Sequence, residues 1–501
     1  MIMQQELMNL CFNKKLEKKT MNIDIKKTNM KIILMLLTFL GVAQGCDDAE
    51  KTDYPPPAQT NVETSYYLTS PDKANLLTLQ SNGIFPLTEN NNFTISVSGG
   101  TTYQEMDGFG YSLTGGSATL INSMSSSARA DLLQELFGTG ENSIGVSYLR
   151  ISIGSSDLDA ITFSYNDLPN GQTDENLNNF SLNPDMANLI PVLNEIIAIN
   201  PDIKILGSPW SAPTWMKTNG STIGGELLPQ YYNAYANYFV KYVQGMAAQG
   251  ITIDAITIQN EPENPNNNPS MVMNADQQKT FVRDYLGPIF QAENVVTKII
   301  LFDHNLDHPN YAISILNDAT AKSYVDGSAF HLYAGQIDNM TLVHNAHPDK
   351  NVYFTEQWIQ APGDFYSDIR WHIRELIIGA PRNWSKNVLE WNLAADSNNN
   401  PHTEGGCTEC LGAITIDGNN VERNPGYYII AHASKFVPAG SVRIESNYSA
   451  EFPNVAYKTP EDKIVVIVLN NSDAQKTFNI NVSSEPVTTV IPAGSVGTYV
   501  W

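Results

Sequence analysis

The sequence is short of positive charge. Its 501 residues contain 29 lysines and arginines against 52 aspartates and glutamates, so the formal net charge is −23. Nucleic acids and anionic membrane surfaces attract basic proteins, and this balance excludes charge-driven binding to either. A neutral substrate fits better. Hydrophobic residues make up 42% of the chain, which is enough for one large domain and a smaller one.

Long apolar runs are also scarce. The run "IILMLLTFLGVAQG" follows Met30 and Lys31 and is too short to span a membrane comfortably. Its basic start and the small residues before Cys46 are typical of a secretory signal. The segment resembles a bacterial lipoprotein signal, in which residues 1–45 are removed, Cys46 is lipidated and residues 1–29 are an over-long start. The acidic "CDDAEK" that begins at Cys46 resembles the export tag of surface lipoproteins in some Gram-negative bacteria. The two resemblances together imply a protein anchored by its lipid alone at the outer membrane or cell surface, or facing the periplasm.

Cysteine is rare. Four are present, of which Cys11 lies in the predicted signal and Cys407 and Cys410 form a C-x-x-C pair. Outside the cytoplasm such a pair predicts a short-loop disulfide, with free thiols as the alternative. A zinc site would need further ligands, but there is no second C-x-x-C, and no glycine-rich phosphate loop follows a strand. We therefore expect neither a metal nor a cofactor.

The chain divides by pattern. Residues 46–65 are polar and proline-rich and predict a tether. Residues 103–420 alternate eight short apolar runs with helical patterns, which predicts a (β/α)₈ TIM barrel; a doubly wound open sheet is the alternative. Residues 421–501 alternate like antiparallel strands and predict a β-sandwich, which we expect the short strands of residues 66–102 to join. The sequence contains no internal repeat.

Polar and aromatic residues gather at the ends of the apolar runs. In a barrel these carboxyl ends form the mouth where active sites lie. The residues placed there by the pattern are Asp157, Trp210, Asn260, Glu261, His331, Tyr333, Glu356, Trp391 and Asn392. We expect them to converge on one site, together with the further tryptophans Trp215 and Trp358.

Two of these residues are glutamates, Glu261 and Glu356. A pair of carboxylates across a pocket can cleave a glycosidic bond, one protonating the leaving oxygen while the other attacks or activates water. Each residue also has a simpler interpretation. A single glutamate at a strand end is usually solvated, and tryptophan is usually buried in a core. Asp157 could cap a helix, and His331 could be a neutral core residue.

Several segments resemble glycoside hydrolase family 30. They lie between about residues 103 and 445 and read "MDGFGYSLTGGSA", "LRISIGSSDLD", "ILGSPWSAPTWMKTNG", "AITIQNEPE", "YFTEQW", "LEWNLA" and "HASKFVPAGSVRI". The resemblance implies a TIM barrel with a side β-sandwich, a retaining mechanism and no cofactor. It also implies that Glu261 is the acid/base and Glu356 the nucleophile. The residues that would line the sugar site are Asp157, Trp210, Asn260, His331, Trp391 and Asn392, to which we add Tyr333.

Within that family, the segment after the eighth strand, "DSNNNPHTEGGCTECLGAITID" at residues 396–417, is most similar to endo-β-1,6-glucanases. The expected substrate is therefore a β-glucan polysaccharide or oligosaccharide, most of all β-1,6-glucan. The alternatives are a glucosylceramidase-like exo-β-glucosidase and a surface glycan-binding lipoprotein without catalysis. The second alternative is disfavoured because both glutamates stand in intact motifs.

Overall fold

The computed structural model describes residues 64–482 and 486–501, which belong to one compact unit from Thr60 to Trp501. The predicted signal, Cys46 and nearly all of the predicted tether lie outside the described residues. Within the described part of the chain, no helix combines the length and apolarity that crossing a membrane would require.

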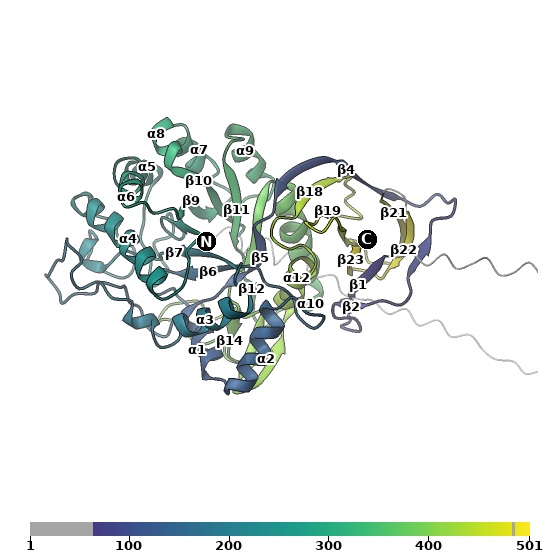
Figure 1. Ribbon diagram of the computed structural model, residues 1–501, viewed down its shortest axis with the longest axis horizontal. Coiled ribbons are helices and arrows are strands. Elements are labelled where there is room, and N and C mark those ends of the chain that lie inside the picture. The colour runs from purple at the N-terminus through teal and green to yellow at the C-terminus, as the bar shows by residue number, and fades with distance from the viewer. Residues whose placement is uncertain (1–63, 483–485) are drawn as a thin grey trace, which may run out of the picture. The chain divides into compact units, whose positions relative to one another are not determined.

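Eight parallel strands close into a barrel (Figure 1), which confirms the TIM barrel over the open sheet. Each strand coincides with one of the eight apolar runs. In chain order they are β5 (Gly108–Ser112), β6 (Tyr148–Ser152), β7 (Lys204–Ser208), β8 (Ala255–Thr257), β9 (Lys298–Asn305), β10 (Val325–His331), β11 (Asn351–Glu356) and β13 (Ser385–Glu390). One buried cluster takes a residue from each of seven of these strands, among them Leu206, Ile300 and Leu389. The barrel is thus filled by side chains and is not a pore.

Helices surround the barrel, and their boundaries follow local capping signals. Asn274, for example, caps α5 in a capping box with Gln277. The helices are α1 (Gly115–Ser123), α2 (Ser126–Phe137), α3 (Leu189–Ile199), α4 (Tyr232–Ala248), α5 (Ala275–Phe281), α6 (Gly287–Ala292), α7 (Asn310–Leu316), α8 (Ala319–Tyr324), α9 (Asn339–Ala346), α10 (Phe365–His372), α11 (Ala380–Arg382) and α12 (Pro425–Ser434). Short π-helical segments, Val282–Leu286 and Ile373–Gly379, join α5 to α6 and α10 to α11.

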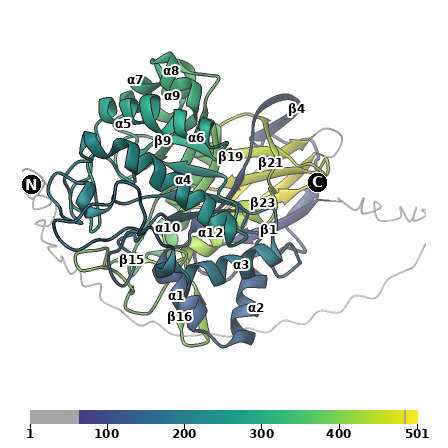
Figure 2. The same ribbon diagram turned by 60° about the vertical axis from the view of Figure 1, so that its left-hand side comes forward.

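A ten-stranded sheet, separate from the barrel, has the strand order β2-β1-β23-β20-β19-β18-β4-β21-β22-β3. Its strands are β1 (Ser65–Thr69), β2 (Thr78–Leu79), β3 (Ile84–Pro86), β4 (Thr94–Glu105), β18 (Val442–Ser446), β19 (Asn454–Lys458), β20 (Ile464–Leu469), β21 (Lys476–Val482), β22 (Val487–Ile491) and β23 (Val496–Val500). The N-terminal strands join the C-terminal ones, as predicted (Figure 2). The expected all-antiparallel pairing is wrong at one point, because β4 and β21 run parallel.

The break between the two folds lies later than residue 420. That residue belongs to a hairpin of β16 (Ile414–Asp417) and β17 (Asn420–Arg423), and β16 in turn pairs with β14 (Ala394–Ala395) beside the barrel. Helix α12 follows, although the pattern indicated no further helices, and the sandwich strands resume only at β18. Because α12 is buried along its whole length, its sequence shows little of the polar–apolar periodicity that identifies a surface helix.

Candidate active site

The polar strand ends converge on a pocket of about 470 Å³ at the mouth of the barrel. Six of the nine predicted strand-end residues line it: Asp157, Trp210, Glu261, Tyr333, Glu356 and Trp391. The lining also includes Trp358, His304 and the asparagine-rich segment 264–267. A larger hollow of about 630 Å³, lined by Ser147, Lys435 and Phe436 among others, contains none of the predicted residues, so its size alone does not make it the site.

Glu261 and Glu356 face each other across the pocket. One carboxylate oxygen of each, together with a ring nitrogen of His331, lie within 4.8 Å of one another. Retaining glycosidases hold their two carboxyl groups about 5–5.5 Å apart, whereas inverting enzymes separate them by about 6.5–9.5 Å to admit a water molecule. The observed spacing therefore matches direct attack by one carboxylate.

Glu261 is held in an unusual backbone conformation just beyond β8. Its φ is +44°, in the left-handed region that residues with a side chain rarely adopt. Its N–H donates to the carbonyl of Asp303 at 2.9 Å, which ties this turn to β9. The amides of Asn264 and Asn267 donate to its Oε2 at 2.7 and 3.4 Å. Strain of this kind persists only where the surroundings fix it, and here it aims the carboxylate into the pocket.

Arg150 is a functional residue that the strand-end rule missed. It lies in the middle of β6, fully buried, and its guanidinium donates to Glu356 Oε2 at 2.6 Å and to Asp303 Oδ2 at 2.8 Å. It also donates to Asn260 Oδ1 at 2.6 Å and lies over the ring of Trp210. The available signal was a single charge inside the apolar run "SYLRISI", because a buried charge needs a partner.

Asp303 was missed for the same reason. It lies in β9 and accepts hydrogen bonds from the hydroxyls of Ser208, Thr257 and Thr355 at 2.7–2.8 Å. Burial disfavours its charge, but Arg150, followed by further donors, holds the pKa of Asp303 well below its usual range. Asp303 is therefore a permanent anion that anchors the arginine beneath the pocket.

His331 shares a proton with the carboxylates around it. Its Nδ1 lies 3.3 Å from Glu261 Oε1 and 3.7 Å from Glu356 Oε1, and its Nε2 lies 3.1 Å from Asp303 Oδ1. Burial disfavours the charged ring, but the three carboxylates, led by Glu356, outweigh burial and raise the pKa of His331 to about 9. Burial would likewise raise the pKa of Glu261, but the contact with His331 lowers it to about 2. The contacts around the ring thus place the proton on the histidine.

Glu356 faces two positive charges. On balance the pKa of Glu356 is raised, because burial outweighs the opposing charges of His331 and then Arg150. The hydroxyl of Tyr333 donates to Glu356 Oε1 at 2.9 Å. Two cations and a hydroxyl donor beside one carboxylate favour its ionised form at neutral pH, which is the form that a nucleophile needs.

Aromatic side chains form one wall of the pocket. Trp210 and Trp391 stack with ring centroids 5.4 Å apart, and Trp358 packs beside them. Flat rings of this kind suit the C–H faces of a sugar. Trp215 does not belong to this wall, because it packs against Tyr231 and donates to Asn166, as its core interpretation predicted.

Asp157 points into the pocket and caps no helix. Its Oδ2 accepts the backbone N–H of Cys407 at 3.4 Å. Burial, followed by repulsion from Glu356, raises the pKa of Asp157 to about 7. A carboxyl group near this balance can either accept from or donate to a sugar hydroxyl.

Asn260, His331 and Asn392 lie behind the pocket lining. Asn260 binds Arg150, while Asn392 accepts from Ser117 Oγ at 3.0 Å and donates to the Cys410 carbonyl at 3.4 Å. These residues therefore support the lining side chains. Cys407 and Cys410 are joined by a disulfide, which confirms that prediction, and both line the pocket.

One carboxylate oxygen from each of Glu261 and Glu356 and a ring nitrogen of His331 lie close enough together to act as ligands to a metal ion. Arg150 and the protonated His331 already place two positive charges beside these carboxylates. A third cation would be repelled by both. The arrangement therefore suits acid–base and nucleophilic chemistry rather than metal binding.

Family models match almost all of the described chain. The "Glycosyl hydrolase family 30 TIM-barrel domain" matches residues 106–437, and the "Glycosyl hydrolase family 30 beta sandwich domain" matches residues 440–499. The chain belongs to glycosyl hydrolase family 30. It is a glycoside hydrolase, and the boundary between the two matches falls between α12 and β18, where the fold also changes.

Relatives within family 30 cover most of the chain. An endo-1,6-beta-D-glucanase of Neurospora crassa is 36% identical over 75% of this chain and 80% of its own length. The lysosomal acid glucosylceramidase of Mus musculus is 29% identical over 80% of this chain and 81% of its own. The solved structure of an endo-β-1,6-glucanase superposes with a TM-score of 0.82 at 34% identity, covering 87% of this chain and 99% of that one.

Proposed function

We propose that this family 30 enzyme cleaves β-1,6-glucan within the chain, with retention of configuration. The observation that carries the mechanism is the spacing of Glu261 and Glu356, whose nearest oxygens lie within 4.8 Å. The linkage is supported by relatives described as endo-1,6-beta-D-glucanases, which are 31–36% identical, whereas the glucosylceramidase relatives are 27–29% identical.

In the first step, Glu356 attacks the anomeric carbon while Glu261 protonates the departing glycosidic oxygen. Arg150 and Tyr333 contact the Glu356 carboxylate at 2.6 and 2.9 Å, so they hold it ionised and aligned. The anomeric C–O bond breaks, an ester to Glu356 forms, and the leaving oxygen departs as a hydroxyl.

Before substrate binds, the proton for this step rests on His331. A bound sugar excludes water, and in the resulting low dielectric a neutral imidazole beside a neutral acid is favoured over an ion pair. A proton would then pass from His331 Nδ1 to Glu261 Oε1, which lie 3.3 Å apart, and the protonated Glu261 would be ready to act as the acid. In the second step Glu261 takes a proton from water, whose oxygen attacks the anomeric carbon and releases Glu356.

The N-terminal segment supports a further part of the proposal. The run after Lys31 and the small residues before Cys46 fit a lipid anchor on the outer membrane of a Gram-negative bacterium. An anchored surface enzyme would meet polysaccharides too large to enter the cell. Replacing Cys46→Ser should abolish incorporation of labelled fatty acid and release the protein from membranes; unchanged labelling would refute the anchor.

The function is tested by product analysis. The chain from residue 60 onward would be incubated separately with β-1,6-glucan, β-1,3-glucan, glucuronoxylan and glucosylceramide, with Glu356→Gln as the matched inactive control. We expect a ladder of β-1,6-linked oligosaccharides from the first substrate only. Glucose released from ceramide or from chain ends alone would favour an exo-β-glucosidase instead. No product from any substrate would favour the binding-protein alternative.

A further inference from the structure

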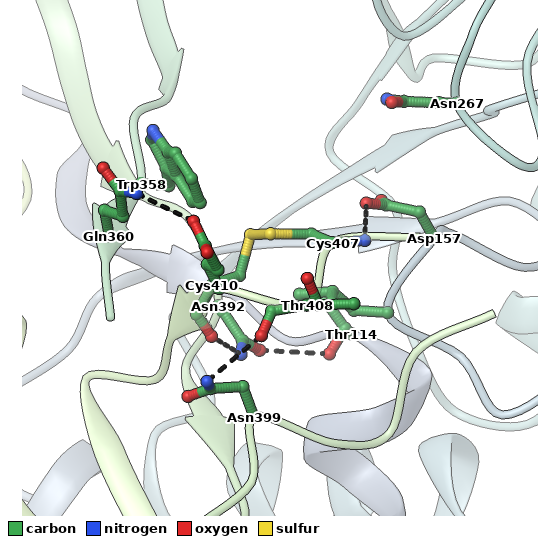
Figure 3. The surroundings of a disulfide bond; sticks show 12 residues. Thr114, Asp157, Asn267, Trp358, Gln360, Asn392, Asn399, Cys407, Thr408 and Cys410 are labelled. Carbon is green, nitrogen blue, oxygen red and sulfur yellow. Dashed lines mark hydrogen bonds between the residues drawn. A yellow bond between two sulfur atoms is a disulfide. The ribbon is translucent and has the colours of Figure 1, made fainter. Parts of the chain in front are cut away.

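The disulfide belongs to a loop that forms one side of the sugar pocket. This strap, residues 396–411, runs from the end of β14 to β15 (Cys410–Leu411). Cys407 and Cys410 both line the pocket, and Figure 3 shows the disulfide between Trp358 and Asp157. Cys410 packs in one cluster with Trp210 and Trp391, so the sulfur atoms continue the aromatic wall.

Hydrogen bonds attach the strap to three strand ends that carry the site. Thr403 N–H donates to the Asp157 carbonyl at 2.9 Å, beyond β6. Its hydroxyl donates to the Asn268 carbonyl at 2.5 Å, in the segment after Glu261. Strand β15 pairs with β12 (Ile359–Gln360), just after Glu356. A shift of the strap would therefore displace the residues after β6, after Glu261 and after Glu356, which line the pocket on different sides.

The contact with Asp157 requires a close approach of the two backbones. A Cβ on Gly406 would lie 2.4 Å from the Asp157 carbonyl oxygen, so only glycine permits the loop to sit there. The next residue, Cys407, then donates its N–H to Asp157 Oδ2 at 3.4 Å (Figure 3). The same residue thus carries both the disulfide and the donor that orients the carboxylate.

We propose that the Cys407–Cys410 disulfide is a positioning element for sugar binding, because it fixes the Cys407 N–H against the Asp157 side chain. The inference rests on the proposed glycosidase function. A disulfide that spans only four residues removes little entropy from the unfolded chain, so its main effect should be local rather than on global stability.

The test is a double-mutant cycle between the disulfide and Asp157, measured on β-1,6-glucan. Cys407→Ser combined with Cys410→Ser should lower kcat/KM by up to about tenfold, mainly through KM, since one hydrogen bond to the Asp157 side chain contributes at most about that much. In an Asp157→Ala background the same two changes should cost less than about twofold, because alanine offers no acceptor to the Cys407 N–H. Thr408→Ser, on the exposed residue between the cysteines, is the matched control and should match the parent enzyme.

Reduction provides a second measurement that does not depend on folding of the variants. Dithiothreitol should reproduce the loss in the folded wild type, reoxidation should reverse it, and Thr408→Ser should respond like the wild type. Additive costs in the cycle, or unchanged kinetics after reduction, would overturn the inference. If the wild type failed to cleave β-1,6-glucan, the proposed function would fail separately. Calorimetric binding of a glucose-configured iminosugar would then decide the role of the disulfide by the same cycle.

Discussion

At the scale of single residues, the division of labour between the two glutamates follows from their contacts. Glu356 contacts two cations and a tyrosine hydroxyl, which favour its ionised form, whereas Glu261 contacts amides and the ring that holds the exchangeable proton. The same residue type thus serves as nucleophile at the end of β11 and as proton donor beyond β8, with β9 and β10 lying between these two strands in the barrel.

Glu261→Gln should separate the two roles. The amide cannot donate a proton to the leaving oxygen, so cleavage of β-glucan should fall by about 10²–10⁴-fold. An aryl β-glucoside with a good leaving group needs no such proton and should lose far less in the glycosylation step, measured as the burst of released phenol. Glu356→Gln is the control and should lose both reactions. Equal losses on both substrates in Glu261→Gln would contradict the acid/base assignment.

His331 should make stability depend on pH. Its pKa is about 9 in the folded protein, above the ordinary value of 6.5, so its contribution is complete below pH 6.5 and is lost as pH rises through 9. The difference corresponds to roughly 3 kcal/mol of unfolding free energy lost between about pH 6.5 and 9.5. Urea unfolding across that range measures it. His331→Gln should show a flatter profile, and equal slopes in the two proteins would refute the shared proton.

At the scale of elements, the strands were predictable because each barrel strand is a short apolar run bounded by turns. Helix α9 was not predicted, since its buried face consists of only Met340 and Val343. Arg150 and Asp303 were missed because strand interiors were taken to be apolar. Their partners come from strands distant in sequence, and no spacing along the chain encodes that pairing.

Strand β9 illustrates what a sequence pattern cannot show. Phe302 and Asp303 both have φ of +69°, and the pairing with β10 skips Asp303 between Phe302 and His304. This bulge turns the aspartate toward Arg150 inside the barrel. The local sequence contains no glycine that would predict a bulge. The conformation is therefore imposed by the buried ion cluster and not by the backbone preferences of the local residues.

Asp303→Asn should therefore destabilise the protein strongly, although asparagine and aspartate have nearly the same shape. Arg150 would lose its fully buried counter-ion, and breaking one partner of such a pair costs about 3–5 kcal/mol of unfolding free energy. Chemical denaturation measures this cost. Asp276→Asn, which removes an exposed ion pair with Lys279, is the matched control and should cost less than about 1 kcal/mol. Similar values for the two variants would show that the cluster does not stabilise the barrel.

At the scale of the whole molecule, the two ends of the described part of the chain are bound into one sheet. Strand β1 lies between β2 and β23, and β4 lies between β18 and β21. Tyr66 stacks on Tyr499 with centroids 4.5 Å apart. Helix α12 joins this sheet to the barrel, because His432 binds Thr69 Oγ1 and Thr498 Oγ1 at 2.8 Å while Tyr111 of β5 donates to the Gly426 carbonyl. The sandwich is therefore part of what holds the barrel's last helix in place.

A chain that begins at Tyr103, the predicted start of the barrel, should consequently fail to fold stably. It would lack β1 and most of β4, exposing the edges of β23, β18 and β21 and leaving His432 without Thr69. Each buried side chain removed, such as Tyr66, Leu68 or Ile95, is worth about 1.5–3 kcal/mol, and together they approach the 5–15 kcal/mol typical of an entire domain. The control begins at residue 60 and should unfold in one calorimetric transition. A Tyr103 chain that gave a soluble protein with the barrel transition intact would show that the barrel folds without the sandwich.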